Sequence, residues 1–314
     1  MDTLTAFLAG WLANTPDAAA PYALAALGLI LCERSGVLNL TAEGLMLVGA
    51  VAAIGANLSM GGYPLAALAI AMAAASVVSL LFAVLAVSLR VNQVIAGLAI
   101  VFFCQGLTTL LGTGFDWQNH PVGGLLGIDI PGLTDLPFIG RILFGQTVVT
   151  YLVLPVFLIA DHVLNRTMAG LRLRAVGENP EAADAAGVSV TLTRYAAIVA
   201  GAAVIGLAGG LVSVGGVKMW FPQMAGGRGW IAIALVIFAR WRPWRALLGA
   251  LLFGGIESLV PRIAGAGIHI PQYFVLMTPY IATLGVMIWT AAKGRSGSMG
   301  PGALGMAFVR EERH

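Results

Sequence analysis

Several windows of about twenty residues in this chain contain no charged side chain, and this pattern limits the fold more than any other feature. A helix of about 20 apolar residues spans the hydrocarbon core of a bilayer, where backbone hydrogen bonds must be satisfied within the protein. Charged residues make up 10% of the 314-residue chain, and hydrophobic residues make up 59%. The sequence therefore predicts an all-α fold, a polytopic transmembrane helical bundle.

The apolar windows divide into about nine candidate spans, and a count of eight or ten also fits their lengths. Residues 3–13 could form a separate interfacial or re-entrant helix before the first span. The seventh and eighth spans are short, so they could form a broken helix or a hairpin. The nine spans lie at about 20–32, 37–58, 64–89, 93–112, 143–163, 195–216, 229–240, 246–260 and 273–292.

Lysine and arginine predict which connections face the cytoplasm. If the N-terminus is outside, thirteen of the 17 basic residues are cytoplasmic, which is the bias of the positive-inside rule. The loop 164–194 is then cytoplasmic, and the Gly- and Pro-rich loop 113–142 is external. We expect residues 1–293 to form one transmembrane domain and residues 294–314 to form a flexible cytoplasmic tail. The external basic residues are then Arg141, Lys218, Arg228 and Arg262.

The loop 164–194 interrupts the apolar pattern with four arginines, two glutamates and one aspartate. Within it, Asn179 can cap a helix, Pro180 suits the first helical position and Gly187 suits the end. Acidic residues in the first turn favour the same assignment. The sequence predicts a two-turn helix here, and a capped helix between two membrane spans indicates a docking element for a soluble partner.

Polar side chains within the spans are few, and burying them at membrane depth is costly. Asn39 and Glu43 stand four residues apart, on one face of the predicted second span near its cytoplasmic end. They could line an inner gate or tie that span to a neighbour. Asn92 and Gln93 begin the fourth span, and Gln105 lies about three and a half turns deeper. These amides could bind neutral polar solutes or form hydrogen bonds between helices. We take these five residues as tentative pathway residues.

The sequence lacks the motifs that would give this chain its own catalytic chemistry. No G-x-x-x-x-G-K-[ST] pattern occurs, and neither Lys218 nor Lys293 follows a glycine-rich loop, so ATP binding of the P-loop type is excluded. Zinc-ligand spacings and a nucleophile elbow are also absent from the sequence. We therefore expect no enzyme, no cofactor and no metal site, and the net charge of +3 gives no indication of nucleic-acid binding.

Four segments of the chain together resemble the membrane permease subunits of bacterial ABC importers. Within these importers, they are similar to the branch for simple sugars and nucleosides, whose transporters use a binding protein of the basic membrane protein type. The resemblance covers about residues 20–292. The four segments are ERSGVLNLTAEGLMLVGA (33–50), LRVNQVIAGLAI (89–100), AVGENPEAADAAGVSVTLTRYAAIVAGAAVIGLAGGL (175–211) and GRGWIAIALVIFARWRPWRALLGALLFGGIESL (227–259).

The resemblance implies a set of partners. The permease would lie in the bacterial inner membrane with its C-terminus in the cytoplasm, pair with an identical or a different second permease subunit, and receive substrate from an external binding protein. A separate ABC ATP-binding subunit would bind ATP, and the helix in loop 164–194 would insert into that subunit as the coupling helix. The implied coupling residues are Gly177, Glu178, Asn179, Pro180, Glu181, Ala182, Ala183 and Gly187.

The resemblance also implies the substrate, which composition does not decide. We expect nucleosides moved by alternating access, with simple sugars as the alternative. A less favoured alternative is an ion-coupled secondary transporter, which would place a carboxylate near mid-membrane and often shows an inverted repeat. Glu43 and Glu257 are acidic residues within the predicted spans, and both are expected near span ends.

Overall fold

The computed structural model describes residues 3–125, 144–265 and 300–309, with residues 127, 140, 271, 274, 277, 281, 284, 285 and 288. In this part the regular elements are helices, and strand pairing is limited to two isolated bridges. Six helices are long and apolar enough to cross a membrane, or seven if the bent pair α6–α7 counts as one span. The helical fold is confirmed, but nine spans are not: the predicted span 273–292 lies mostly outside the described residues.

Most helices begin where the sequence offers a starting signal. The Asn92 side chain accepts from the N–H groups of Val94 and Ile95 and caps α4, and Ser189 caps α9 in the same way. Pro64 stands in the first turn of α3, where it needs no hydrogen-bond donor. The elements are α1 (Thr3–Glu33), α2 (Ala42–Ser59), α3 (Pro64–Ala83), the π-helix η1 (Val84–Ser88), α4 (Gln93–Gly114), α6 (Val148–Arg166), α7 (Met168–Glu178), α8 (Pro180–Ala185), α9 (Val190–Gly210), the π-helix η2 (Leu211–Val217), α10 (Arg228–Ala239) and α11 (Pro243–Gly265).

Three predicted boundaries are wrong. Residues 3–13 are not a separate helix, because α1 runs without interruption from Thr3 to Glu33. The second span begins at Ala42 rather than at residue 37. The eighth span is longer than predicted, and α11 forms a hairpin with the short α10. Apolar content alone did not show where one helix ends and the next begins.

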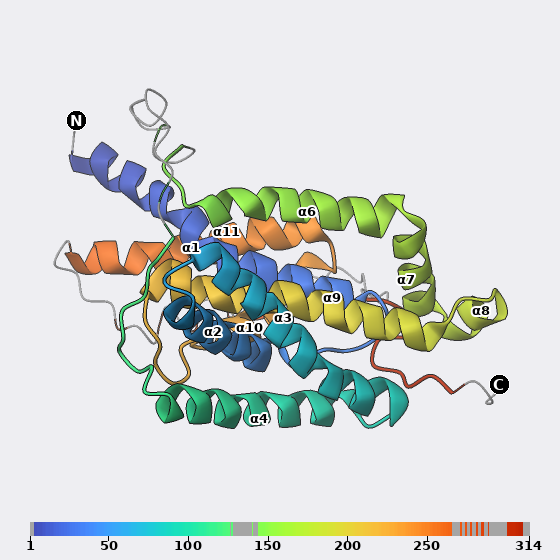
Figure 1. Ribbon diagram of the computed structural model, residues 1–314. Helices are drawn as coiled ribbons and strands as arrows, with labels where there is room; N and C mark the ends of the chain where they lie inside the picture. Colours follow the sequence, from blue (N-terminus) through green and yellow to red (C-terminus); the bar gives the residue numbers. More distant parts are fainter. Residues whose placement is uncertain are drawn as a thin grey trace.

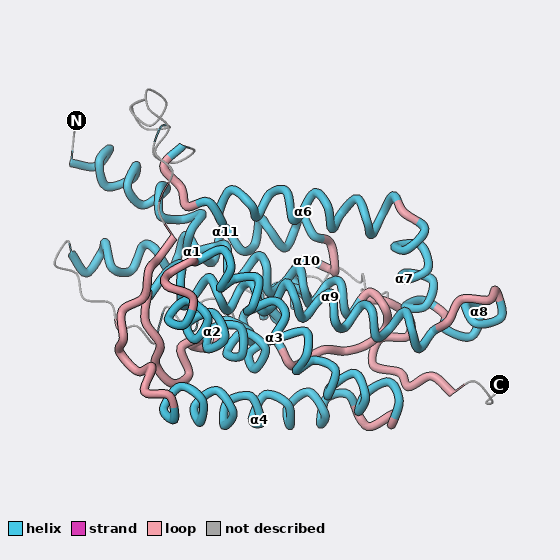
Figure 2. Tube along the Cα trace, viewed as in Figure 1, coloured by secondary structure: helices cyan, strands magenta, loops and turns pink. Residues whose placement is uncertain are grey.

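Segment 34–41 turns back into the bundle after α1 and is mostly buried (Figure 2). The length of α10 gives the depth that segment 34–41 reaches. The 12 residues of α10 span about 18 Å. Just after α10, the Nε1 atom of Trp241 donates to the Glu33 carboxylate at 2.6 Å. In the first turn of α10, Gly229 N donates to the Glu43 carboxylate at 2.7 Å. Because α10 connects these two points, α2 begins well inside the bundle.

Segment 218–227 enters from the opposite end, after η2. The backbone carbonyls of Lys218 and Trp220 accept from Val122 N at 2.9 Å and from Asn119 N at 3.2 Å, in the loop that follows α4. At the other end of the segment, Gly227 N donates to the Glu43 carboxylate at 2.9 Å. The N-termini of α2 and α10 therefore meet around one carboxylate, which favours both helix dipoles.

The two segments belong to two units with the same order of elements. The first unit is α1, segment 34–41, α2 and α3, and the second is α9 with η2, segment 218–227, α10 and α11. α1 and α9 run in opposite directions and pack against each other, α3 packs on α9, and α11 packs on α1 (Figure 1). This arrangement is an inverted-topology repeat, in which transporters commonly bind their cargo where the broken helices meet.

Glycines allow the central helices to approach closely. A Cβ atom on Gly28 of α1 would collide with the backbone of Gly201 in α9, and the reverse is also true. Gly49 of α2 lies equally close to the backbone of Gly206 in α9. In lipid, where water does not drive helices together, such small-residue contacts are a main source of association.

Candidate functional site

The predicted two-turn helix of loop 164–194 is present as α8 and projects from one end of the bundle (Figure 1), which we call the α8 end. The side-chain oxygen of Asn179 accepts from Ala182 N at 2.9 Å, and Pro180 occupies the first helical position, as the sequence predicts. Gly187 follows the helix with φ at +81°, a conformation that favours glycine. The local geometry predicted for this helix is therefore confirmed.

α8 has one buried face and one exposed face. Ala183 packs with Val176 and Val190 in a small apolar cluster, whereas Glu181 and Ala182 are exposed. The helix that precedes it, α7, was not predicted; it is bent by 70° from α6 and begins at a cap in which Thr167 accepts from Gly170 N. The exposed face of α8 is available for a partner.

The α8 end is held to the rest of the bundle by residues 300–309. Ala303 N donates to Gly177 O at 2.9 Å, and Gly302 N donates to the Glu178 carboxylate at 3.1 Å. Two residues further on, Gly305 N donates to Gly36 O at 3.0 Å. Part of the tail predicted to be flexible is thus anchored to α7 and to segment 34–41, while residues 294–299 and 310–314 lie outside the described residues.

Arg34 joins segment 34–41 to the turn after α10 at the same end. Its guanidinium donates to Trp241 O from Nε at 3.2 Å and from Nη2 at 3.0 Å. Burial lowers the pKa of the Arg34 guanidinium, and the nearby Glu178 carboxylate opposes that shift. A change in the position of Glu178 would therefore alter the electrostatic environment of Arg34, which joins segment 34–41 to the turn after α10.

Two predicted pathway residues, Asn39 and Glu43, do not share a helix face. Asn39 lies in segment 34–41, before α2 begins, and its side-chain oxygen accepts from the backbone N–H and the hydroxyl of Thr41 at 2.9 and 2.6 Å. Glu43 accepts from Gly227 and Gly229 and so ties α2 to α10. Of the two roles considered for Glu43, the contacts favour the structural tie.

The remaining predicted pathway residues stand at three different positions. Asn92 is the exposed cap of α4, and Gln93 is buried, where its Oε1 atom accepts from Leu38 N at 2.7 Å. Gln105 is half-buried on α4. The amide nitrogens of Asn39 and Gln93 are buried without a hydrogen-bond partner among the described residues. The structure therefore does not gather the five predicted residues into one site.

A cluster that sequence reasoning missed lies nearer the middle of the bundle. The Arg228 guanidinium pairs with the Glu257 carboxylate at 2.5 Å, and the Tyr22 hydroxyl donates to the same carboxylate at 2.7 Å. Glu257 stands about 21 Å along α11 from Pro243, and a bilayer core is about 30 Å thick. Arg228 was assigned to an external connection and Glu257 to a span end; both assignments are wrong, because α10 begins inside the bundle and α11 extends to Gly265.

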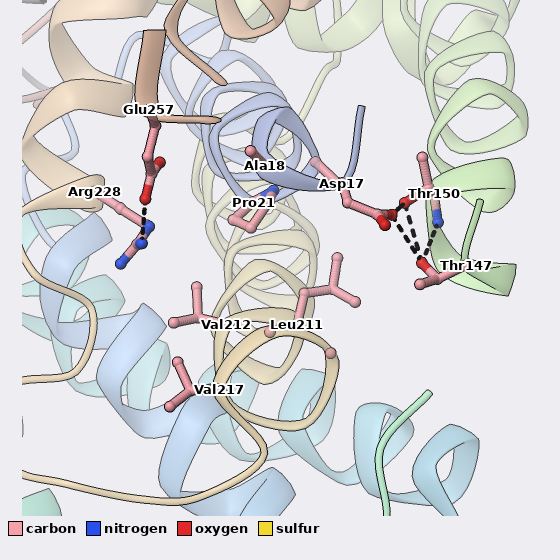
Figure 3. A pocket seen from close by; sticks show the side chains of 13 residues that line it. Asp17, Ala18, Pro21, Thr147, Thr150, Leu211, Val212, Val217, Arg228 and Glu257 are labelled. Carbon is pink, nitrogen blue, oxygen red and sulfur yellow. Dashed lines mark hydrogen bonds and ion pairs between the residues drawn. The ribbon is translucent and has the colours of Figure 1, made fainter. Parts of the chain in front are cut away.

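Two cavities meet at this ion pair, whose side chains are 24% and 35% exposed. The smaller one, which we call the central cavity, has a volume of about 310 Å³ and lies between α1, α6, η2, α10 and α11 (Figure 3). The second has a volume of about 600 Å³ and is lined by segment 218–227 together with α10 and α11. Both volumes fit small-molecule sites, which typically hold ~300–1,000 Å³.

Polar groups stand on two sides of the central cavity. On one side, the Asp17 carboxylate accepts from the hydroxyls of Thr147 and Thr150, and on the other lies the pair of Arg228 and Glu257 (Figure 3). η2 forms part of the wall between them, and π-helical turns are frequent at functional sites. Among the described residues, no three His, Cys, Asp or Glu side chains are grouped to hold a metal ion.

Comparisons with known proteins agree with a transport function. Residues 12–289 match the family model described as "Branched-chain amino acid transport system / permease component". The chain is 37% identical to the "Putative glucose ABC transporter permease protein TsgC13" of Haloferax volcanii, over 97% of this chain and 99% of that protein. No solved structure matches the chain significantly.

Two further relatives have names that refer to nucleosides. The chain is 35% identical to the guanosine ABC transporter permease protein NupQ of Bacillus subtilis, over 94% of this chain and 95% of that protein. It is 31% identical to the nucleoside ABC transporter permease protein NupC of Lactococcus lactis, over 93% of this chain and 94% of that protein.

Proposed function

This chain belongs to the family of branched-chain amino acid transport system permease components, and on that basis we propose that it carries nucleosides inward across the cell's inner membrane. It is a permease subunit of an ABC transporter and not itself an enzyme, because full-length relatives at 31–37% identity are permease proteins of such transporters. The family supports transport driven by ATP bound by a partner subunit, and the missing P-loop motif agrees with this.

We assign coupling to the ATP-binding subunit to α8 and the residues around it, Gly177 to Gly187. Three observations support this assignment. The helix projects beyond the bundle, its Glu181 and Ala182 are exposed, and its other face packs on the apolar cluster at Val176 and Val190. A rigid, capped helix that is tied to segment 34–41 through residues 300–309 can transmit a push from a soluble partner into the bundle.

Arginines at the α8 end support an orientation in the membrane. Arg34, Arg174, Arg242 and Arg245 line a cavity of about 450 Å³ at the α8 end. Clustered arginines are typical of the cytoplasmic side of membrane proteins. We therefore place α8 and residues 300–309 in the cytoplasm and the N-terminus outside, where a substrate-binding protein would deliver its cargo. A second permease subunit, identical or different, completes the transporter.

Nucleosides are the favoured substrate because two relatives with nearly full coverage are named for guanosine and for nucleosides. A simple sugar is the second candidate, since TsgC13 is the relative with the higher identity of the three. The inverted repeat and the acidic residue at mid-bundle are features that ion-coupled secondary transporters also show. Membership in a family of ABC permeases excludes that alternative.

The proposal is tested by uptake in cells that differ only in this chain, with the neighbouring ATP-binding subunit present in both strains. The substrates are radiolabelled adenosine, guanosine, uridine and ribose. We expect nucleoside uptake to be lost without the chain and to be competed by other nucleosides but not by ribose. Loss of ribose uptake alone would assign the chain to sugar transport, and no loss of any uptake would refute the nucleoside proposal.

The coupling role is tested by Ala182→Trp, which adds bulk to the exposed face of α8. We expect uptake to fall to background while the amount of membrane-inserted chain stays unchanged, and copurification with the ATP-binding subunit to weaken. Ala73→Trp, at an exposed position on α3, is the matched control and should transport normally. Normal uptake by the Ala182 variant would sink the coupling assignment.

A further inference from the structure

The cavity of about 450 Å³ at the α8 end gathers positive charge. It lies between α6, α7, the start of segment 34–41 and the start of α11, and we call it the arginine cavity. Four arginines and one aspartate line it, so its ionised lining carries a net charge of about +3. Among the described residues, none of these arginines forms an ion pair with a carboxylate. The protein therefore leaves most of this charge uncompensated. The four are Arg34, Arg174, Arg242 and Arg245.

The arginines of this cavity repel one another. Arg34 is half-buried and is fixed in place by its two hydrogen bonds to Trp241 O. Burial lowers the pKa of its guanidinium, the Glu178 carboxylate opposes that shift, and the charges of Arg174 and Arg242 lower the pKa further. Like charges that are held close together in a partly buried site are unfavourable. An anion that enters the cavity would relieve this repulsion.

The donors of the cavity suit a phosphate group. A guanidinium is planar and presents its N–H groups as a fork that matches phosphate oxygens in a bidentate manner. Arg242 and Arg245 are exposed, and their side chains form no hydrogen bond among the described residues, so these donors are available. The carboxylate in the lining, that of Asp161, already accepts from the Asn165 amide at 2.8 Å. A phosphate ester therefore fits this lining better than a cation or a neutral solute.

Exposed apolar side chains continue from the cavity along two helices. α6 and α11 pack side by side (Figure 1). On α11, Trp244 lines the cavity, and Leu248 and Leu252 follow at intervals of four residues, which places all three on one face. On α6, Leu154 and Leu158 are more than half exposed in the two turns before the residues that line the cavity. The charged cavity therefore stands at one end of an apolar surface.

We propose that the arginine cavity binds the headgroup phosphate of an anionic phospholipid from the cytoplasmic leaflet, and that the acyl chains lie along the exposed leucines of α6 and α11. A free phosphate would use the charged part of this surface alone, whereas a lipid uses both parts. Basic pockets between membrane-spanning helices on the cytoplasmic side are known to bind such headgroups. This inference goes beyond the proposed function, because it does not depend on the transported solute.

The lipid site is tested by tryptophan fluorescence of the whole transporter, with its ATP-binding subunit, in phosphatidylcholine nanodiscs. Phosphatidylglycerol with brominated acyl chains replaces increasing fractions of the lipid, and brominated phosphatidylcholine is the reference. Bromine quenches a tryptophan that it contacts, and Trp244 lies in the wall of the cavity. We expect phosphatidylglycerol to quench at lower fractions than phosphatidylcholine, in a saturable manner. Trp244→Phe should remove this difference between the two lipids.

The role of the arginines is tested by the double variant Arg242→Gln with Arg245→Gln. Each basic residue close to an anionic lipid contributes a factor of about five in affinity, so the apparent affinity for phosphatidylglycerol should fall about 25-fold. The matched control is Arg166→Gln with Arg172→Gln, which removes two exposed arginines at the same end that do not line the cavity. Its apparent affinity should change by less than about twofold. All four side chains are exposed, so both variants should fold.

Several results would overturn the lipid site. Absence of selective quenching in the unaltered protein, or an equal loss of affinity in both double variants, would leave general attraction to the membrane surface as the explanation. Removal of the selective quenching by soluble glycerol 3-phosphate would make a free phosphate ester the ligand. Unchanged quenching in the Arg242 and Arg245 variant, together with weaker copurification of the ATP-binding subunit, would make that subunit the occupant. Nucleoside uptake enters none of these measurements, so the proposed function stands or fails separately.

Discussion

Segments 34–41 and 218–227 break the helices at equivalent places in the two repeat units, yet their surroundings differ. Segment 34–41 is mostly buried and is hydrogen-bonded to α4 through Gln93 and to the tail through Gly305. Half of segment 218–227 is exposed, including Phe221 and Gln223, which line the larger cavity. Both breaks are hydrogen-bonded to their neighbours, but one is mostly buried and the other borders a cavity.

This difference indicates that the break in the helices has a different role in each repeat unit. Buried polar contacts raise the cost of disturbing a segment, because an orphaned donor or acceptor loses its partner without regaining water. A segment beside a cavity can move or contact a solute at a lower cost. We therefore expect substitutions around segment 34–41 to lower stability, and substitutions in segment 218–227 to change transport.

The largest effect on stability is expected for Glu43→Leu. The substitution leaves the N–H groups of Gly227 and Gly229 without their acceptor at the point where α2 and α10 begin. The expected loss is about 3 kcal/mol of the free energy of unfolding, measured by titration with denaturing detergent in mixed micelles. Glu43→Gln keeps one acceptor oxygen and should lose less. Equal stability of Glu43→Leu and the unaltered protein would contradict the anchoring role of this carboxylate.

A smaller loss is expected for Gln93→Leu, which removes the acceptor for Leu38 N within segment 34–41. One orphaned backbone donor predicts a loss of about 1–2 kcal/mol. Gln105→Leu on the same helix is the matched control, since its side chain makes no hydrogen bond among the described residues, and it should unfold like the unaltered protein. The same detergent titration distinguishes Gln93→Leu from Gln105→Leu. Identical unfolding midpoints for the two variants would contradict the expected difference between the segments.

Ala303→Pro tests whether the tail contributes to the anchoring. Proline has no N–H group, so the hydrogen bond to Gly177 O is lost, at a cost of about 1 kcal/mol. The bond joins the tail to the residues before α8. We therefore expect ATP-driven uptake to fall strongly while the free energy of unfolding falls only by this amount. Ala303→Ser keeps the N–H group and should retain uptake. A Pro variant with full uptake would show that the tail plays no part in coupling.

The smallest effect on stability is expected for Phe221→Ala in segment 218–227. The side chain is 37% exposed and borders the larger cavity, so unfolding should change by less than about 0.5 kcal/mol. Uptake should nevertheless change, because the wall of the cavity changes. Phe102→Ala, at an exposed position on α4, should alter neither property. A marked loss of stability in the Phe221 variant would erase the contrast between the two segments.

Local signals allowed part of the molecule to be predicted. The short helix α8 was located because its cap, its first proline and its terminal glycine are neighbours in the chain. The class of fold followed from the length of the apolar windows. Each of these features depends on residues within a few positions of each other, which a single sequence displays directly.

The breaks and the mid-bundle cluster depend on distant residues and could not be predicted. Residues 37–41 read as part of an apolar span, and the acceptor for Leu38 N is Gln93, in another helix. Arg228 looked external because it precedes an apolar window, and its partner Glu257 lies in another helix. The sequence did not show that α10 begins deep in the bundle, since that depth is set by contact with Glu43.

The contacts of the tail also set the order in which the molecule can be completed. Gly36 lies near the start of the chain, and its carbonyl receives its donor from Gly305, close to the end. A ribosome makes Gly305 only after every helix from α1 to α11 has been synthesised and offered to the membrane. The α8 end therefore stays incomplete until residues 300–309 have been synthesised and have bound to it.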